Sequence, residues 1–325
     1  MSQANEKSAA VVVTYNRKDL LGQCLDSLLR QSHPLDALYI IDNHSADGTY
    51  EYLLGRSLIA PAGRSDSEPV ETTRPIASGG TVHYVRMPEN TGGAGGFHEG
   101  MKRAAAAGFD WLWLMDDDLL TAPDAMEVLV QKTSTLRRQG KESFLLNSLV
   151  LPRDGPDGDA LAVPLQELAA GGTPKRGHHH WRLSEVRSEV KDGLYPWACP
   201  FNGTFVPARA VLEIGLPNKE FFLWGDERDW LWRAAKRFDL YTAVDSKVFH
   251  PTFWNIGFDW KQYYGIRNAI VVNRHFRWAA LRNLKFILVS LARGARHRPG
   301  GPVLVLRAIR DGLMGRLGRN PDYPP

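Results

Sequence analysis

The chain has 325 residues, of which 43% are hydrophobic and 23% are charged, and its formal net charge is +4. This length and this balance exclude an intrinsically disordered chain, and two cysteines exclude both a disulfide framework and a structural zinc site built from cysteines alone. Because no run of about 18 apolar residues occurs and the first residues lack the order of a secretory signal, we expect a cytoplasmic protein.

The first third of the chain alternates strand patterns with helix patterns. Apolar runs predict strands at 9–14, 37–41, 81–87 and 111–115, and helical spacing follows each of the first three strands, the last of these helices at 95–107. Residues 60–80 are rich in Pro, Ser, Gly and Arg, so a long surface loop is predicted there. The alternation predicts an α/β fold whose central sheet is mostly parallel and has helices on both faces.

The pattern changes after Pro123. Helices are predicted at 124–138, 262–273, 278–293 and 302–317, and strands at 144–151 and 241–249. The stretch 152–177 is again rich in Gly, Pro and Asp and is followed by three consecutive histidines, 178–180. Since adjacent side chains point in different directions, the histidines are predicted to lie in a solvent loop rather than to form a metal cluster.

The charge is distributed unevenly along the chain. Residues 261–325 contain thirteen Lys or Arg and two acidic residues, a net charge of +11, which leaves −7 for the first 260 residues. Within 302–317 an apolar stripe lies apart from three arginines, a pattern that favours the surface of an anionic membrane over nucleic acid, with packing on the body as the alternative. The stripe consists of Leu306, Ile309, Leu313 and Leu317, and the arginines are Arg307, Arg310 and Arg316.

Three aspartates, Asp116, Asp117 and Asp118, follow the predicted strand at 111–115. Ligands of open α/β sheets bind at the carboxyl ends of the strands. Side chains of an extended segment alternate, so Asp116 and Asp118 are expected to face the same way and to suit Mg²⁺ or Mn²⁺. The alternative is a helix N-cap with acidic residues in the first turn, but a cap needs one carboxylate, and three crowded carboxylates repel one another without a cation.

Two further segments carry candidate chemistry. Four of the five residues 92–96 are glycines, which lets backbone approach a ligand before a helix N-terminus that can bind an anion. Asp226 and Glu227 lie among aromatic residues, and both apolar surroundings and a neighbouring like charge raise the pKa of a carboxyl group toward that of a general base. The alternative is a capped helix with Asp226 as N-cap and Asp229 as the third helical residue.

Together these segments resemble the family 2 glycosyltransferases with the GT-A fold. The resemblance rests on 11–17 (VVVTYNR), 41–49 (IDNHSADGT), 90–97 (NTGGAGGF) and the three aspartates, and it covers about 9–251. It implies a nucleotide-sugar donor, Mn²⁺ or Mg²⁺ held by the aspartates, and inversion at the anomeric carbon. It divides the chain into a catalytic domain at 1–260, with a nucleotide-sugar half (1–120) and an acceptor and base half (121–260), and a basic helical region at 261–325.

The resemblance also assigns roles to individual residues. Donor binding falls to Thr14, Arg17, Asp42, Asn90, Gly92, Gly93, Gly95, Gly96 and Asp117, and the cation to Asp116, Asp118 and His250. The acceptor side falls to Trp197, Asn202 and Gly203, together with Trp224 and Trp230, of which one would form a wall of the sugar pocket. The catalytic base is Glu227 or Asp226, because the subgroup usually has Asp at the position of Glu227.

Within the family, the glycine segment and residues 224–230 are most similar to galactofuranosyltransferases and related rhamnosyltransferases. We therefore expect transfer of galactofuranose from its uridine diphosphate donor to a glycan or lipid-linked glycan of the cell envelope, with rhamnose from its deoxythymidine diphosphate donor as the alternative. A non-catalytic nucleotide- or carbohydrate-binding module is the alternative of a different class. The basic tail would hold the enzyme peripherally on the inner face of the membrane.

Overall fold

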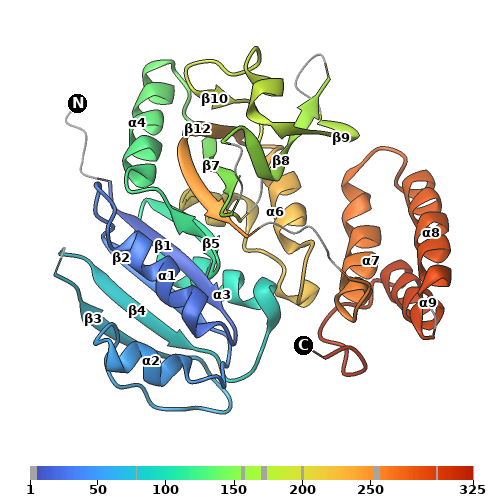
Figure 1. Ribbon diagram of the computed structural model, residues 1–325, viewed down its shortest axis with the longest axis horizontal. Coiled ribbons are helices and arrows are strands. Elements are labelled where there is room, and N and C mark those ends of the chain that lie inside the picture. The colour runs from blue at the N-terminus through green and yellow to red at the C-terminus, as the bar shows by residue number, and fades with distance from the viewer. Residues whose placement is uncertain are drawn as a thin grey trace.

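The computed structural model describes residues 6–77, 79–154, 158–169, 174–198, 201–251, 257–297 and 299–324, without the side chains of 176 and 177. Figure 1 shows one large sheet with helices on both of its faces and the C-terminal helices beside it. The strands are β1 (Ser8–Thr14), β2 (Ala37–Asp42), β3 (Val70–Pro75), β4 (Thr81–Arg86), β5 (Trp111–Asp116), β6 (Leu120–Thr121), β7 (Phe144–Pro152), β8 (Ala160–Leu168), β9 (Pro174–Arg182), β10 (Leu194–Tyr195), β11 (Thr204–Pro207) and β12 (Asp239–His250). The helices are α1 (Lys18–Leu28), α2 (Thr49–Gly55), α3 (Gly92–Ala106), α4 (Ala125–Arg138), α5 (Arg209–Ile214), α6 (Asp226–Ala234), α7 (Lys261–Val272), α8 (Ala279–Arg296) and α9 (Gly301–Leu313), and short 3₁₀ turns span Leu183–Val186, Lys219–Phe221 and Asn273–His275.

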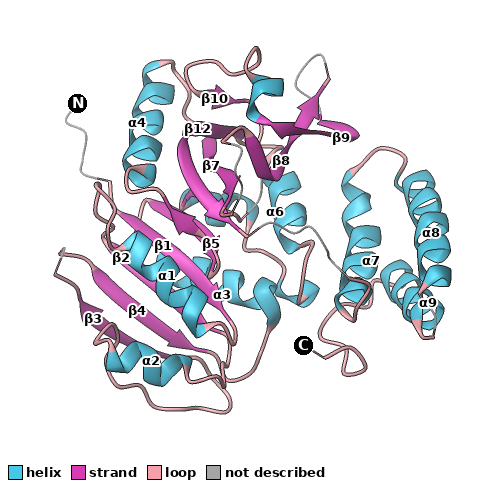
Figure 2. Cartoon of the chain, in the orientation of Figure 1, coloured by secondary structure: helices cyan, strands magenta, loops and turns pink. Residues whose placement is uncertain are grey.

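The order of strands in the sheet is β10-β12-β7-β11-β5-β1-β2-β4-β3, and β6 pairs with β12 (Figure 2). The strands β5, β1, β2 and β4 are parallel, and β7 is parallel to β12, whereas β11 runs antiparallel between β5 and β7. Two antiparallel steps restore the direction, so β5, β1, β2, β7 and β12 all end at one edge of the sheet. The predicted α/β class with helices on both faces is confirmed, and its parallel part is the N-terminal half.

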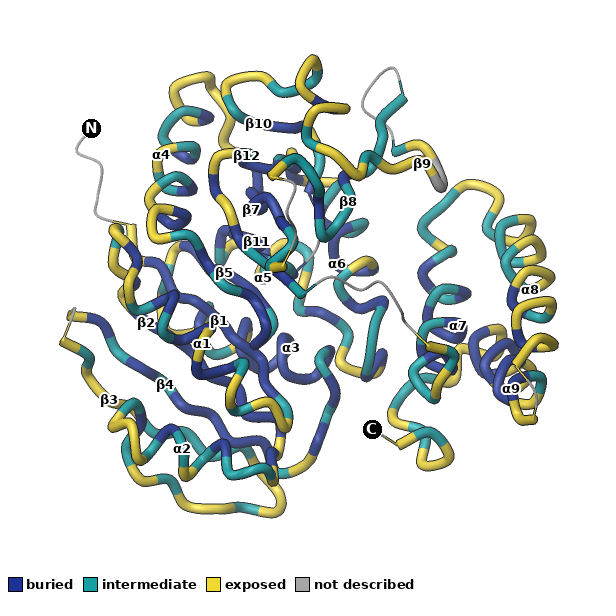
Figure 3. The backbone as a smooth tube through the Cα atoms, viewed as in Figure 1, coloured by how far each residue is buried: buried dark blue, intermediate teal, exposed yellow. Residues whose placement is uncertain are grey.

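The register places three candidate residues side by side at that edge. Thr14 is paired with Asp42 across β1 and β2, and Val13 with Asp116 across β1 and β5. The central strand β1 is buried along its whole length, with Ala10 and Val12 in one apolar cluster and Val11 in the other. Burial of both faces explains why its sequence is a continuous apolar run (Figure 3).

The loop predicted at 60–80 is wrong, and the stretch 152–177, to which the sequence assigned no element, also contains strands. The stretch 60–80 contains β3, an edge strand that pairs with β4, and 152–177 contains β8 and the start of β9. Both lack a strand signal because β3 is only partly buried and because β8 and β9 form a separate two-stranded ribbon. The histidines at 178–180 lie in β9 and not in a loop, although His178 and His179 are exposed.

The C-terminal helices pack chiefly on one another. Buried residues of α7 and α9 share an apolar cluster with Phe222, and Ile309 is part of it. The predicted stripe on α9 is therefore divided, because Ile309 faces the cluster while Leu306 and Leu313 are exposed. Helix α8 presents a longer exposed apolar row of Leu281, Leu284, Leu288 and Val289, with Trp278 just before it. Among the described residues, none of the helices has the length and apolar content needed to cross a membrane.

Candidate functional site

The aspartates after β5 contact the end of β1. The Thr14 hydroxyl donates to Asp117 Oδ2 over 2.7 Å, and Arg17 Nη1 lies 3.3 Å from Asp117 Oδ1 and 2.9 Å from Asp118 Oδ2. The Arg17 side chain is 44% exposed, whereas both aspartates are buried. The end of β1 and the residues just after it therefore supply a hydroxyl group and a cation to the aspartates.

Asp118 also contacts the end of β12. His250 Nε2 lies 3.3 Å from Asp118 Oδ1, and His250 Nδ1 is 2.6 Å from the Pro251 carbonyl oxygen. The argument that paired Asp116 with Asp118 by alternation does not hold, because β5 ends at Asp116 and Asp117 and Asp118 lie in the turn that follows. His250 joins Asp118 because β5 and β12 end at the same edge of the sheet.

Crowding of the carboxylates changes their acidity. Burial, together with the charges of its two neighbours, raises the pKa of Asp116 to about 8, and burial raises the pKa of Asp117 to about 6 although Arg17 opposes this. Burial would also raise the pKa of Asp118, but the contacts with His250 and Arg17 outweigh it and lower that pKa. At neutral pH the cluster thus holds at least one proton that a cation would displace.

The residues fit a divalent cation in their chemistry. Asp118 Oδ1 is buried and, within the described part of the chain, receives no hydrogen bond, although the imidazole of His250 lies beside it. A donor set of two carboxylates and one imidazole suits Mn²⁺ or Mg²⁺. Among the described residues, however, no three such side chains already converge on one point. Asp116, Asp118 and His250 therefore remain a predicted set of ligands.

The candidate base lies at the start of α6. Gly225, with φ of 97°, is the N-cap, and Asp226 is the first helical residue, so the capping alternative for Asp226 is wrong. Asp226 is buried, while Glu227 is half-buried and its Oε2 accepts from Gly225 N over 2.8 Å. Burial and then the charge of Glu227 raise the pKa of Asp226 well above its usual range, and the charge of Asp116 adds to this. The acidic pair at the start of α6 and the aspartates after β5 are therefore close enough for their charges to interact.

The third acid of this segment has a structural role. Asp229 Oδ1 is 2.8 Å from both Arg274 Nη2 and His275 Nε2, and Asp229 Oδ2 is 3.1 Å from Arg233 Nε. Burial alone would raise its pKa, but these partners lower the pKa of Asp229 to about 2. Asp229 thus joins α6 to the turn after α7. A residue that only capped α6 would not make these contacts with Arg274 and His275.

The glycine segment belongs mainly to a helix. Helix α3 begins at Gly92, three residues earlier than predicted. A Cβ atom on Gly92 would lie 1.9 Å from the Phe222 carbonyl oxygen, and one on Gly96 would lie 2.4 Å from Val13, whereas one on Gly93 would meet nothing within 4 Å. Gly95 is closed by Thr91 in the same way. Close packing explains three of the four glycines, so only Gly93 leaves open space for a ligand.

Two predicted donor residues bond within the chain. Asp42 is fully buried, and its oxygens accept from Ser45 N over 2.8 Å and from the Tyr84 hydroxyl over 2.5 Å. Asn90 Oδ1 accepts from Gly92 N and from Asn43 Nδ2. Asn43, which binds Asn90 and the Gly92 carbonyl, is not among the predicted site residues. These contacts shape the loops after β2 and β4, and a nucleotide contact for Asp42 and Asn90 stays a prediction.

The acceptor-side aromatic residues separate into core and surface. Trp230 is fully buried and its Nε1 donates to the Gly215 carbonyl over 2.9 Å, so it cannot form a wall of a sugar pocket. Trp224 is half-buried and remains available for that role. The ring centroids of Trp197 and Trp232 lie 5.4 Å apart with the rings tilted at 53°, which favours a packing role for Trp197.

The backbone before β11 is also committed to the sheet. Gly203, with φ of 80°, donates to Leu114 O and accepts from Ser148 N, each over 2.9 Å. The side chain of the preceding residue, Asn202, is half-buried. Gly203 thus has a structural reason to be glycine, and acceptor binding by Asn202 is untested.

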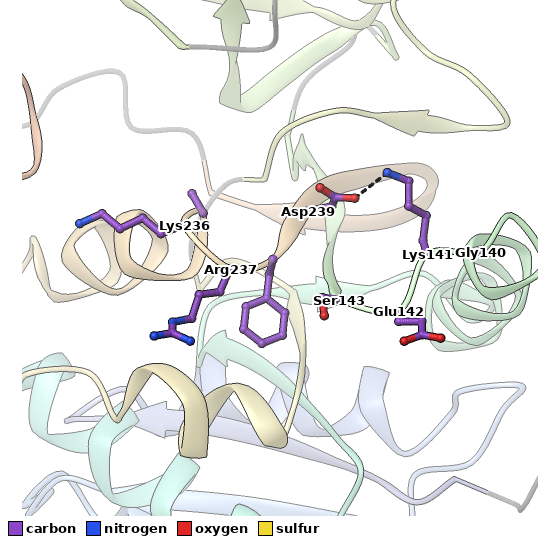
Figure 4. A pocket seen from close by; sticks show the side chains of 9 residues that line it. Gly140, Lys141, Glu142, Ser143, Lys236, Arg237 and Asp239 are labelled. Atoms are coloured by element: carbon purple, nitrogen blue, oxygen red, sulfur yellow. Dashed lines mark hydrogen bonds and ion pairs between the residues drawn. The ribbon is translucent and has the colours of Figure 1, made fainter.

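A surface hollow at the opposite edge of the sheet has three basic and two acidic residues in its lining. Figure 4 shows its lining, which includes Lys141, Lys236 and Arg237, with Lys141 Nζ 2.8 Å from Asp239 Oδ2. These residues precede β7 and β12, so the hollow lies away from the strand ends that carry the aspartates and His250. We therefore assign the chemistry to the carboxylate edge.

Comparisons with known proteins agree with this geometry. Residues 9–140 match the model of the glycosyl transferase family 2. The chain is 33% identical over 248 residues to galactofuranosyltransferase GlfT1 of Mycobacterium tuberculosis, which covers 76% of this chain and 70% of the relative. It is 33% identical over 253 residues to GlfT1 of Mycolicibacterium smegmatis, covering 76% and 71%.

Solved structures are similar in fold. A mannosyltransferase from Pyrobaculum calidifontis, solved with GDP-Man and Mn²⁺, matches with a TM-score of 0.56 and 14% identity over 97% of this chain and 89% of that one. TarS 1–349 of S. aureus matches with a TM-score of 0.54 and 12% identity over 95% and 82%. At these identities the likeness concerns the fold, which is that of GT-A glycosyltransferases.

Proposed function

The chain belongs to glycosyltransferase family 2, and we propose that it is an inverting galactofuranosyltransferase that uses a nucleoside-diphosphate donor and a hydroxyl group of a glycan or lipid-linked glycan. The observation that carries the proposal is that two sets of acidic residues lie near each other: the aspartates after β5 and the pair Asp226 and Glu227 at the start of α6. The charge of Asp116, the last residue of β5, raises the pKa of Asp226, and His250 lies beside Asp118 at the same edge of the sheet. The residues proposed to bind the donor and the proposed catalytic base would therefore lie next to each other.

We assign the base to Glu227. A sugar hydroxyl group is a weak nucleophile until a carboxylate accepts its proton. Glu227 is half-buried and therefore accessible, whereas Asp226 is buried and its pKa is raised well above the usual range by that burial and by the charge of Glu227. The hydroxyl oxygen attacks the anomeric carbon while the bond from that carbon to the phosphate oxygen breaks, and the proton goes to Glu227. A single displacement of this kind inverts the anomeric centre.

Other side chains prepare the site for this step. Burial and the charge of Glu227 both raise the pKa of Asp226, which favours its neutral form over a second negative charge beside Glu227. Thr14 and Arg17 fix Asp117 and Asp118, and half-buried Trp224 offers a ring face on which a sugar can stack. When held by Asp116, Asp118 and His250, Mn²⁺ or Mg²⁺ would neutralise the charge of the leaving diphosphate.

The choice of sugar rests on the relatives. Both GlfT1 proteins are named as galactofuranosyltransferases, and each matches about three quarters of this chain. A donor screen with mass spectrometry tests the choice directly. We expect a product one hexose heavier than the acceptor with uridine diphosphate galactofuranose, and none with the deoxythymidine diphosphate donor of rhamnose. Product from the rhamnose donor alone would contradict the assignment of galactofuranose. Binding of nucleotide without turnover of any donor would contradict the assignment as an enzyme and favour a binding module.

We further propose that the protein binds an anionic membrane surface through α8. The exposed row of Leu281, Leu284 and Leu288 runs along one side of this helix, and exposed cations lie at its edge, among them Lys285 and Arg293. An apolar row with a cationic border suits the interface of an anionic bilayer. Such a contact would hold the sugar site close to a lipid-linked acceptor.

A further inference from the structure

The backbone just before the proposed base has an unusual conformation. Residues 221–225, which we call the base turn, include three positive φ values: 64° at Phe222, 60° at Trp224 and 97° at Gly225. Leu223 N donates to the Phe221 carbonyl oxygen over 2.8 Å, and Phe222 has ψ of −64°. This combination is a classic γ-turn, which is rare and strained and persists only where surrounding contacts hold it.

Helix α7 holds the base turn from one side through Asn268. Its side-chain nitrogen, Nδ2, lies 3.0, 2.9 and 2.6 Å from the carbonyl oxygens of Phe221, Leu223 and Trp224. An amide group has two N–H bonds, so two protons are shared among three carbonyl oxygens. Asn268 is 1% exposed, which makes each of these contacts costly to lose.

Arg267 orients that amide and extends the contact. Its Nε donates to Asn268 Oδ1 over 2.8 Å, so the Asn268 nitrogen must face the base turn. Arg267 Nη2 donates to the Phe221 carbonyl over 2.8 Å, and Nη1 donates to the Gly318 carbonyl over 2.6 Å. Arg267 is also 1% exposed. The two residues together bind the base turn to the C-terminal part of the chain.

Helix α3 holds the base turn from the other side. Ala94 N donates to the Phe222 carbonyl oxygen over 3.2 Å, and Gly92 has no room for a side chain because of that same oxygen. The first turn of α3 belongs to the glycine segment that the donor half contributes. The base turn therefore lies between the donor half and the C-terminal helices, directly before Asp226 and Glu227.

We propose that Asn268, oriented by Arg267, is a positioning residue that fixes the base turn and thereby the placement of Glu227 and Trp224. The role of Glu227 in this statement rests on the proposed function. Asn268 acts through the backbone and touches neither donor nor acceptor. The C-terminal helices are then part of the catalytic geometry in addition to any role at a membrane.

Two measurements on Asn268→Ala test the proposal. Hydrogen exchange of the 221–227 amides is expected to become about tenfold faster, since the buried amide is the main partner of these carbonyls. The kcat for sugar transfer is expected to fall at least about tenfold while the KM for the donor changes less than about twofold, because the donor residues at the ends of β1 and β5 are untouched. Partial unfolding would also lower the apparent kcat at an unchanged KM, so the transfer rate is expressed per folded protein.

The matched control is Asn283→Ala. Asn283 lies on α8, donates to the Ile270 carbonyl and accepts from Asn273, so it supports the same helical bundle without touching the base turn. Exchange at 221–227 and kcat within about twofold of wild type are expected for it. Equal effects of Asn268→Ala and Asn283→Ala would overturn the proposal, as would unchanged exchange in the first.

A second variant covers a failure to fold. Asn268→Asp keeps the size of the side chain and the oxygen that Arg267 Nε contacts, but loses the donating NH₂ group. It is expected to reproduce the faster exchange and the lower kcat, and wild-type values for it would overturn the proposal. If wild-type protein transfers no sugar, the proposed function fails, and the exchange data alone then decide whether Asn268 holds the base turn.

Discussion

Asp226 and Glu227 are neighbours in sequence but have different surroundings. Asp226 is buried at the first position of α6, where the charge of Asp116 contributes to its raised pKa. Glu227 is partly exposed to solvent and accepts a hydrogen bond from the backbone N–H of Gly225. Sequence alone left the base open between these two residues, because adjacent carboxylates look alike until burial separates them. Exposure favours Glu227.

The aspartates after β5 predict a stability that depends on pH and on cations. The pKa values of about 8 for Asp116 and about 6 for Asp117 exceed that of an unfolded aspartate, so the folded state holds protons that the unfolded chain has lost. The free energy of unfolding contributed by these groups should therefore fall as pH rises from about 4 to about 8. Mn²⁺ replaces those protons, so it should raise Tm more at pH 8 than at pH 5.

Thermal unfolding with and without Mn²⁺ at the two pH values checks this prediction. Stabilisation of about 2.7 kcal/mol is expected at pH 8 when Mn²⁺ is at one hundred times its Kd. Asp116→Asn should abolish most of it, and Asp245→Asn, which changes a side chain that is 61% exposed, should leave it intact. Equal Mn²⁺ stabilisation at both pH values in wild type would contradict the account.

At the scale of elements, the sequence predicted the parallel half well and the ribbon poorly. Strands β1, β2, β4 and β5 are buried and continuous in apolar residues, so their positions and the meeting of their ends followed from pattern alone. Strands β3, β8 and β9 carry no such pattern because they are at an edge or outside the main sheet. The helix that contains the glycine segment begins three residues earlier than predicted, because close helix packing and ligand approach both select glycine.

That distinction gives a prediction for α3. Gly92→Ala should destabilise the protein by at least about 1–3 kcal/mol, because its φ of 71° disfavours a side chain and the new Cβ would meet the Phe222 carbonyl. Gly93→Ala is the control, since open space surrounds it and alanine favours a helix by about 0.5–1 kcal/mol. Chemical denaturation measures both. Equal stability of the two variants would show that packing does not explain Gly92.

For the molecule as a whole, the C-terminal helices are more than a basic extension. Arg267 and Asn268 join α7 to the base turn, and Asp229 joins α6 to the turn after α7. The sequence located the helices and the excess of positive charge, but could not reveal which apolar face stays exposed. That depends on how α9 packs, since Ile309 faces α7 while the row on α8 has no partner among the described residues.

The exposed row on α8 predicts binding to lipid. Wild-type protein should float with anionic liposomes and much less with neutral ones, because both apolar and cationic groups contribute. Leu284→Asp with Leu288→Asp should reduce binding at least about tenfold, since each buried leucine is worth about 1.5 kcal/mol or more. Leu212→Asp on α5, a leucine that is 86% exposed, is the matched control. Equal flotation of the double variant and this control would exclude α8 as the contact.

The central claim is that Glu227 serves as the base in transfer of a sugar from a nucleoside-diphosphate donor. The most direct test is the transfer rate from uridine diphosphate galactofuranose with Mn²⁺ present, followed by mass spectrometry for wild type, Glu227→Gln and Asp226→Asn. The account predicts a loss of about 10²–10⁴-fold for Glu227→Gln and a much smaller loss for Asp226→Asn, because Asp226 is buried and does not accept the proton of the acceptor. Transfer by folded Glu227→Gln at the wild-type rate would contradict it.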